Sequence, residues 1–203
     1  MIAHPPIAGV ILAGGRSSRM REDKALTPLA GRPLIAHVVE RLRPQVDFLI
    51  ISGNGDPGRF DAFDAPVVAD ADPLAYSGPL AGVRAAMALA SSRGAALLAS
   101  APCDAPFLPA NLVARLFETL ERTGAPAAAA RRADQIEPLF AVWRVATASS
   151  IDEALARGDA GPRALLIHCG AAFAEFDECA DAFDNVNDSA ALAAAEARLA
   201  ATD

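Results

Sequence analysis

The sequence predicts an α/β fold in which a mostly parallel sheet is covered by helices on both faces. Residues 7–12 form a continuous apolar run that stops at Ala13-Gly14-Gly15, as a buried parallel strand does when it ends in a turn. Short apolar runs of this kind then alternate with longer segments whose apolar residues recur at helical spacing. With 203 residues and a 53% hydrophobic composition, the chain can bury the core of one such domain.

The elements alternate regularly as far as residue 122. After the first strand, Pro33 opens an amphipathic helix, because proline suits the first helical position. Pro79 and Pro109 open two further helices in the same way. The sequence thus predicts helices at 33–43, 79–92 and 109–122, and buried strands at 47–52, 67–69 and 95–100.

Beyond residue 126 the alternation is looser. The remaining predicted elements are strands at 138–143 and 172–176 and helices at 145–158, 161–170 and 189–201. No internal repeat and no linker divides the chain. We therefore expect one domain over residues 1–203, with halves at about 7–125 and about 126–203.

Charge and hydropathy exclude two classes of partner. The net charge of −7, from 18 basic and 25 acidic residues, argues against a general nucleic-acid binder, which would be basic. No segment approaches the roughly 18 uncharged apolar residues that cross a bilayer. The first 15 residues lack the basic region of a signal peptide, so we expect a cytoplasmic protein without a membrane partner.

The cysteines and histidines do not suggest a disulfide framework or a zinc site. Cys103, Cys169 and Cys179 are odd in number and contain no C-x-x-C pair, which fits a reducing cytoplasm and small buried side chains. No H-x-x-x-H pair and no G-x-S-x-G occurs either, so zinc and serine-hydrolase chemistry have little support.

The loop after the first strand has the composition of a phosphate site. It lies at the carboxyl end of a strand, where open α/β sheets bind their ligands. Gly14 and Gly15 allow backbone N–H groups to approach an anion, and Arg19 and Lys24 add positive charge. Gly-Gly alone is also common in ordinary connectors, but the two cations favour a polyphosphate ligand. The loop is not a Walker A motif, because no Gly-Lys-Ser/Thr occurs.

A second glycine-rich segment matches a dinucleotide-binding motif only in its glycine spacing. Residues 53–58, GNGDPG, match G-x-G-x-x-G after a strand. A dinucleotide fingerprint also requires a helix running straight out of the loop. The following RFDAFDAP is too short and is interrupted by Pro66, so a turn is the better interpretation.

Acidic residues follow two other strands at the same predicted edge. Asp104, clamped between two prolines, is suited to Mg²⁺, which needs few protein carboxylates when phosphates supply other oxygens. Asp104 could equally cap a loop or helix. Asp70 and Asp72 precede Gly78-Pro79, and either acid could join the metal site or cap a turn.

The last candidate segment is Phe183-Asp184-Asn185-Val186-Asn187-Asp188, which precedes the C-terminal helix. Asn185 and Asn187 project the same way if this segment is extended, and their amides could contact a polar ligand. An N-cap and turn before the helix is the alternative.

These segments together resemble the molybdenum cofactor guanylyltransferase family, within the wider nucleoside-triphosphate transferases. The resemblance covers about residues 8 to 197 and is carried, in order, by LAGGRSSRM, DKAL, GRPLIAHV, GPLAGV, PCDAPFLP, EPLFAVWR and FDNVND. It implies a Rossmann-like three-layer sandwich of the nucleotide-diphospho-sugar transferase type. It also implies transfer of GMP from GTP to molybdopterin, or its molybdenum-loaded form, with release of pyrophosphate.

The resemblance also assigns roles to residues. It implies that Leu12, Ala13, Gly14 and Gly15 lie against the nucleotide, that Lys24 binds phosphate, and that Asp104 binds Mg²⁺. From the charge of the loop, we expect Arg19 to hold the triphosphate together with Lys24 during catalysis. Ser52 or Asn54 would contact the guanine, Asp70 or Asp72 would be the acid before Gly78, and Asn185 and Asn187 would contact the pterin. The residues expected at the site are Leu12, Ala13, Gly14, Gly15, Arg19, Lys24, Ser52, Asn54, Asp70, Gly78, Asp104, Asn185 and Asn187.

Some points of the resemblance stay open. Arg21 stands where the family usually has glycine, which alters the path of residues 20–23. A cytidylyltransferase acting on the same pterin, usually with LAAG in place of LAGG, is the nearest alternative, and a non-catalytic nucleotide- or cofactor-binding module is another. Besides GTP and molybdopterin, we expect transient contacts with proteins that deliver the pterin or mature molybdoenzymes.

Overall fold

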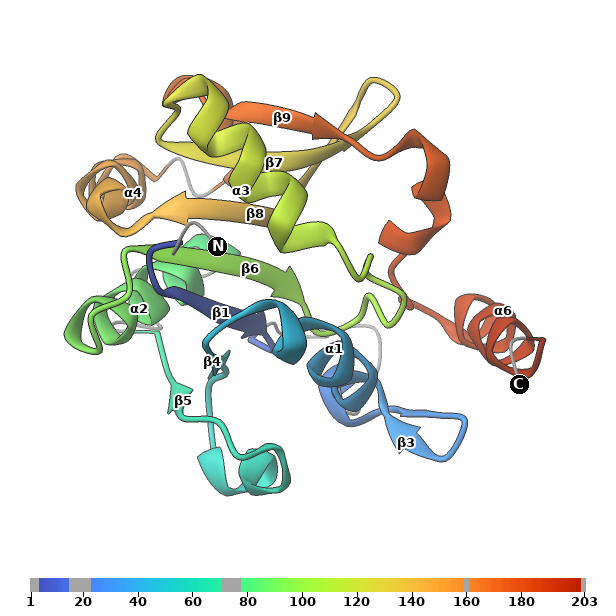
Figure 1. Cartoon of the computed structure of the whole chain (residues 1–203). Helices are drawn as coiled ribbons and strands as arrows, with labels where there is room; N and C mark the ends of the chain where they lie inside the picture. Colours follow the sequence, from blue (N-terminus) through green and yellow to red (C-terminus); the bar gives the residue numbers. More distant parts are fainter. Residues whose placement is uncertain (1–3, 15–22, 71–77, 159–160, 202–203) are drawn as a thin grey trace.

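The computed structural model describes residues 4–14, 23–70, 78–158 and 161–201. A seven-stranded sheet runs through both halves of the chain (Figure 1). In sheet order its strands are β5 (Val67–Val68), β4 (Phe48–Ser52), β1 (Ile7–Leu12), β6 (Leu97–Pro102), β8 (Gln135–Arg144), β7 (Ala127–Arg132) and β9 (Ala172–Glu175). The first four strands are mutually parallel, β8 is antiparallel to both of its neighbours, and β7 is parallel to β9. The predicted mostly parallel sheet is confirmed.

Helices cover both faces of the sheet, which confirms the three-layer sandwich. Figure 1 views the face that carries α1 (Leu34–Leu42) and α3 (Leu112–Thr123). The opposite face carries α2 (Pro79–Ser92), α4 (Ala148–Ala156) and α5 (Pro162–His168). Short 3₁₀ helices connect the elements: η1 (Lys24–Leu26), η2 (Arg43–Gln45), η3 (Pro57–Phe63), η4 (Val145–Thr147) and η5 (Asp177–Phe183).

The first strand shows why its sequence is apolar throughout. Ile7 and Ile11 pack in the core under α1 and α3, whereas Ala8, Val10 and Leu12 pack in the core under α2. Successive side chains of a strand point to opposite faces, so a strand between two helical layers needs apolar residues at every position.

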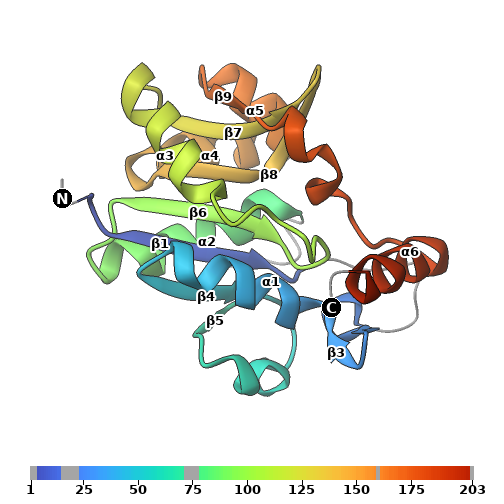
Figure 2. The same ribbon diagram turned by 45° about the vertical axis from the view of Figure 1, so that its right-hand side comes forward.

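The C-terminal helix α6 (Ser189–Ala200) lies away from the sheet, beside the small hairpin of β2 (Pro28–Leu29) and β3 (Arg32–Pro33) (Figure 2). A separate apolar cluster holds it there, in which Val186 and Ala195 contact Leu29, Leu34 and Phe107. The end of the chain is thereby anchored next to its N-terminal third.

Four features of the local structure differ from the prediction. The strand β7 was not predicted, because Ala127–Ala130 have low strand propensity, and only burial between β8 and β9 favours the extended form. The helix predicted from Pro109 begins at Leu112, and the strand predicted at 95–100 occupies Leu97–Pro102. The fourth difference is the predicted helix at 145–158, which begins as the 3₁₀ helix η4 before α4.

The prediction that residues 53–58 do not form a dinucleotide-binding loop is confirmed. The segment after the glycine-rich turn is the 3₁₀ helix η3 and not the α-helix that a dinucleotide fingerprint requires. Within the described part of the chain, no helix is both long and apolar enough to cross a bilayer.

Candidate functional site

Three of the predicted segments meet at one edge of the sheet because the strands before them are in register. Leu12, the last residue of β1, lies opposite Ser52 at the end of β4 and opposite Pro102 at the end of β6. The next residues continue this pairing, since Ala13 N donates to Ser52 O (2.7 Å) and Cys103 N donates to Leu12 O (3.1 Å). The loops after β1, β4 and β6 therefore start side by side at the carboxyl edge.

This pairing limits what the loop after β1 can offer an anion. The Ala13 amide is already bonded to Ser52, and the Leu12 side chain is buried in the core under α2. Gly14 is exposed and lies beside the next loop, where a Cβ on it would be 3.9 Å from Asn54 Nδ2. Of the described part of this loop, Gly14 is thus the residue open to a ligand.

Lys24 connects segments that are far apart in sequence. It begins η1, which Asp23 caps by accepting a hydrogen bond from Ala25 N (3.2 Å). The Lys24 ammonium donates to the Asp104 carboxylate and to the side-chain oxygen of Asn187. One cation therefore joins the predicted phosphate, metal and pterin segments.

The Asp104 carboxylate is largely buried, and only one of its two oxygens has a described partner. Its side chain is 12% exposed, and Oδ2 forms the ion pair with Lys24. The other oxygen, Oδ1, is buried and has no hydrogen-bond partner among the described residues. A buried carboxylate oxygen without a partner is costly, so this atom is suited to a cation or donor that arrives with a ligand.

The segment with the two asparagines is fixed against Asp104. Val186 N donates to Asp104 O (2.8 Å), while the Val186 side chain is buried in the cluster that anchors α6. Asn185 and Asn187 flank Val186 and are exposed. The predicted alternation is thus observed, with the middle residue packed inward and the asparagines open to solvent.

Cys103 has no nucleophilic role at this edge. Burial, together with the negative charge of Asp104, raises the pKa of the Cys103 thiol to about 12. The thiolate is the reactive form of cysteine, so at neutral pH Cys103 is an inert, buried thiol.

Asn54 and Asp70 form a reciprocal pair at the edge formed by β4 and β5. Asn54 Nδ2 donates to Asp70 Oδ2 (2.9 Å), and Asp70 N donates to Asn54 Oδ1 (3.0 Å). Ser52, the alternative to Asn54, is 2% exposed, and its hydroxyl lies where a Cβ on Gly82 would be. Asn54 is therefore the more accessible of the two candidates for contact with a base.

The N-terminus of α2 also faces this edge. Gly78 precedes the helix with φ 127° and ψ 174°, a conformation that L side chains rarely adopt. One turn later, Gly82 lies against Leu12 and Ser52. The helix start thus directs its partial positive charge toward the ends of β1 and β4, where an anion would be stabilised.

Some predicted site residues lie outside the described part of the chain. They are Gly15, Arg19, Arg21 and Asp72.

Sequence reasoning missed two arginines that hold the site segments. Arg59 forms an ion pair with Asp23 (2.5 Å) and donates to Asn54 O (2.9 Å). The one feature of the sequence that could have pointed to Arg59 was its position just after the glycine-rich turn.

The second missed arginine is Arg132, at the end of β7. It donates to buried Glu137 through Nε (2.6 Å), and to Asp184 (2.6 Å) and Ala180 O (2.8 Å) through Nη1. Asp184 immediately precedes Asn185, so Arg132 fixes the entry to the asparagine segment. Glu137 belongs to the motif EPLFAVWR, which was the available signal.

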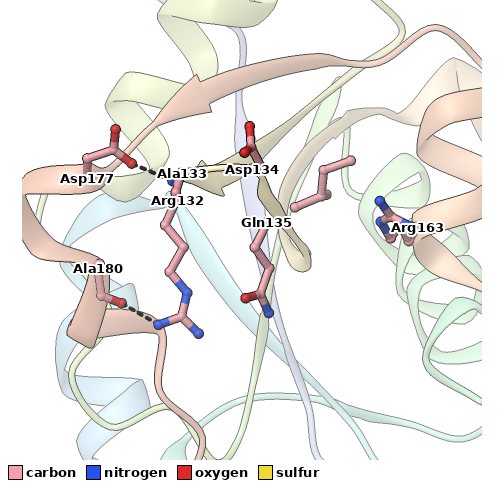
Figure 3. Close-up of a pocket in the computed structure, with 8 residues that line it drawn as sticks. Arg132, Ala133, Asp134, Gln135, Arg163, Asp177 and Ala180 are labelled. Carbon is pink, nitrogen blue, oxygen red and sulfur yellow. Dashed lines mark hydrogen bonds between the residues drawn. The ribbon is translucent and has the colours of Figure 1, made fainter.

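A pocket of about 900 Å³ has Arg132 among its lining residues (Figure 3). It lies between the β7–β8 hairpin, η5 and the start of α5, with Gln135 and Arg163 among its lining residues. Arg132 and Ala180 face Arg163 across this space. None of the predicted site residues lines this pocket.

Metal binding at this edge would depend on oxygens supplied by a ligand. Among the described residues, no three His, Cys, Asp or Glu side chains are close enough to form a protein-only metal cage. Asp104 offers a buried carboxylate oxygen, Oδ1, that has no hydrogen-bond partner among the described residues, and Mg²⁺ needs few protein carboxylates when phosphates complete its coordination.

The chain is similar to a defined protein family over most of its length. The family model described as a MobA-like NTP transferase domain matches residues 9–173. The molybdenum cofactor guanylyltransferase of Rhodobacter capsulatus is 44% identical over 193 residues, which cover 95% of this chain and 96% of the relative. The protein of the same name from Yersinia pestis strain Pestoides F is 39% identical and covers 90% of this chain and 91% of its own.

Solved structures support the same fold. The crystal structure of molybdopterin-guanine dinucleotide biosynthesis protein A from Archaeoglobus fulgidus superposes with a TM-score of 0.78. The two sequences are 23% identical, and the match covers 96% of this chain and 99% of that one.

Proposed function

Because this chain belongs to the MobA-like NTP transferase family, and within it to the molybdenum cofactor guanylyltransferases, we propose that it transfers GMP from GTP to molybdopterin. The products are the guanine dinucleotide form of the cofactor and pyrophosphate. The curated relatives that support this reaction match more than nine-tenths of the chain.

The observation that carries the proposal is the position of Lys24. Its ammonium contacts Asp104 and Asn187, which the family resemblance links to the metal and to the pterin. A transferase must hold the nucleotide phosphates and the acceptor phosphate within reach of each other, because most of its rate enhancement comes from positioning and charge stabilisation. Lys24 lies at the junction that this requires.

In the proposed reaction, a phosphate oxygen of molybdopterin attacks the α-phosphorus of GTP in line. The new P–O bond forms as the bond from the α-phosphorus to the bridging oxygen breaks, and pyrophosphate leaves with that electron pair. The acceptor phosphate is already ionised near neutral pH, so no general base is required. Lys24 stabilises the charge that develops on the phosphates, and the N-terminus of α2 adds partial positive charge at the same edge.

Asp104 fits the role of a magnesium ligand. Its buried Oδ1 has no partner among the residues that the structure covers, and Lys24 is the only described group on its Oδ2. Mg²⁺ bound there together with the substrate phosphates would supply neutralisation of their negative charge. Asp104 would orient that ion, and Lys24 would then be free to turn toward the phosphates.

We assign recognition of guanine to the loop after β4. Asn54 is partly exposed, and its amide is oriented by Asp70, whereas Ser52 is buried. The relatives named above are all guanylyltransferases, and the chain carries LAGG in place of LAAG, so the cytidylyltransferase alternative is not favoured.

We place the reaction in the cytoplasm, where GTP is available. We also expect transient contacts with the proteins that supply molybdopterin and that receive the finished cofactor, because a reactive pterin is best passed on directly.

The proposal is tested by measuring pyrophosphate release with Mg²⁺, molybdopterin and one nucleotide at a time. We expect release with GTP and little with CTP or ATP. Omitting molybdopterin is the matched control, since release without the acceptor would indicate hydrolysis and not transfer. Preferential release with CTP would overturn the choice of base, and no release with any nucleotide would overturn the transferase assignment.

A further inference from the structure

Arg59 links the two loops that border the proposed nucleotide site. It lies in η3, outside every motif of the family resemblance. Its Nη1 forms an ion pair with Asp23 Oδ2 at 2.5 Å, and its Nη2 donates to the backbone oxygen of Asn54 at 2.9 Å. One guanidinium thus contacts the loop before Lys24 and the loop after β4.

Each of these contacts reaches a residue with a role at the site. Asp23 caps η1, the 3₁₀ helix in which Lys24 is the first residue. Asn54 is held on its other side by Asp70. The guanidinium therefore sets the separation between the loop assigned to the phosphates and the loop assigned to the base.

The surroundings of Arg59 hold its side chain in this bridging position. The guanidinium lies over the Phe60 ring, 4.5 Å from its centroid, where a cation–π interaction is favourable. A Cβ on Gly53 would be 2.9 Å from Phe60 Cε2 and 3.2 Å from Arg59 Nη2, so glycine leaves the space that both side chains use. The planar fork of arginine matches two acceptors on different loops, which lysine cannot reproduce.

We propose that Arg59 is a positioning residue that fixes Asp23, which precedes Lys24, and Asn54, which follows β4, at the spacing that GTP requires. It acts through Asp23 and the Asn54 backbone, without contact with the reacting atoms. This inference rests on the proposed function, because it takes GTP to be the nucleotide.

The expected signature is a loss of GTP affinity without a loss of folding. Arg59 and Asp23 side chains are each about a quarter exposed (26% and 27%), and partly exposed ion pairs contribute little to stability. The Arg59→Ala protein should therefore melt near the wild-type temperature. Its KM for GTP should rise about tenfold, the scale of one lost charged hydrogen bond, while its KM for molybdopterin changes less than about twofold.

Arg43→Ala is the matched control. Arg43 also donates to a backbone oxygen of η3, that of Phe63, and carries the same charge. Among the described residues, Arg43 forms no hydrogen bond to either loop of the site, so removing it should leave both KM values near wild type. A rise in the GTP KM for Arg43→Ala as large as that for Arg59→Ala would overturn the inference, because it would indicate a general effect of η3.

A double-mutant cycle tests whether Arg59 acts through Asp23. Asp23→Asn keeps a side-chain oxygen that can cap η1 but removes the charge that pairs with Arg59. We expect Asp23→Asn to raise the GTP KM alone, and to add little when combined with Arg59→Ala. Independent, multiplicative effects of the two substitutions would contradict coupling through this pair.

Two further measurements keep the test decisive. If Arg59→Ala does not fold, Arg59→Lys replaces it, and we expect a smaller rise in the GTP KM with a native melting temperature. An unchanged KM would overturn the inference.

GTP affinity is also measured by calorimetry without pterin. Wild-type protein that binds GTP but releases no pyrophosphate would contradict the proposed reaction, whereas the Arg59 inference would then be judged on GTP affinity alone. Equal GTP affinity for wild type and Arg59→Ala would overturn it.

Discussion

The Lys24 ammonium donates to the Asp104 carboxylate across 80 residues of sequence, and the second oxygen of that carboxylate is buried without a described partner. This pair places the cation at the start of η1 beside an anion that follows β6 and has one carboxylate oxygen without a described partner. The proposed function requires both residues at one edge of the sheet, Lys24 for the phosphates and Asp104 for Mg²⁺.

Asp104→Asn should lower kcat by about a hundredfold or more, the scale of removing one charge-stabilising group from an active site. The amide keeps the shape of the side chain and can still accept from Lys24, so the fold should persist. The matched control is Asp47→Asn, because Asp47 accepts a hydrogen bond from Ile7 N (2.7 Å) at the opposite edge of the sheet. Near-normal turnover of Asp104→Asn at saturating Mg²⁺ would remove Asp104 from the metal site.

Lys24→Met should weaken GTP binding by roughly ten- to a hundredfold, because a charged hydrogen bond contributes about 1.5–3 kcal/mol. Methionine preserves much of the length of the side chain and removes its charge. Titration calorimetry with GTP measures the effect, and Arg32→Met serves as control, since Arg32 on the β2–β3 hairpin forms an exposed ion pair with Glu40 of α1. Unchanged GTP affinity would show that Lys24 does not bind the phosphates.

The two asparagines should differ in their effects. Asn187 contacts Lys24, so Asn187→Ala should raise the KM for both GTP and molybdopterin. Asn185 lies on the same exposed side of Val186, and Asn185→Ala should raise the molybdopterin KM severalfold and leave the GTP KM near wild type. Steady-state kinetics with each substrate varied in turn distinguish the two, and a pure GTP effect of Asn185→Ala would contradict the pterin assignment.

Gly82→Ala should destabilise the protein by about 1–3 kcal/mol, because an added Cβ would collide with Ser52 Oγ and lie 3.3 Å from Leu12 Cδ2. Urea unfolding followed by circular dichroism measures the change. Gly161→Ala is the control, as its added Cβ would meet only the Ala164 Cβ at 3.9 Å, and it should cost less than about 0.5 kcal/mol. Equal stability of the two variants would contradict the close packing of α2 on β1 and β4.

The sequence predicted the elements whose residues are apolar at regular spacing. The strands β1 and β4 and the helices α1 and α2 lie where the pattern placed them, because burial between two layers demands that pattern. The strand β7 was not predictable in this way, since a run of alanines is extended only through its pairing with β8 and β9.

The candidate site was likewise predictable from the sequence only in part. Topology alone predicts that Gly14, Asn54 and Asp104 share one edge, because they follow parallel strands. The contacts of Arg59 and Arg132 join residues that are tens of positions apart, and an arginine outside a motif carries no local pattern that would reveal such contacts.

The most direct test of the account follows the α-phosphate itself. The purified protein is incubated with Mg²⁺, molybdopterin and GTP labelled at the α-phosphate. The products are then separated, and their masses are measured by mass spectrometry. We predict that the label moves into a species with the mass of molybdopterin joined to GMP, in amounts equal to the pyrophosphate released. Label recovered only as GTP or free GMP, from folded protein with intact pterin, would contradict guanylyl transfer.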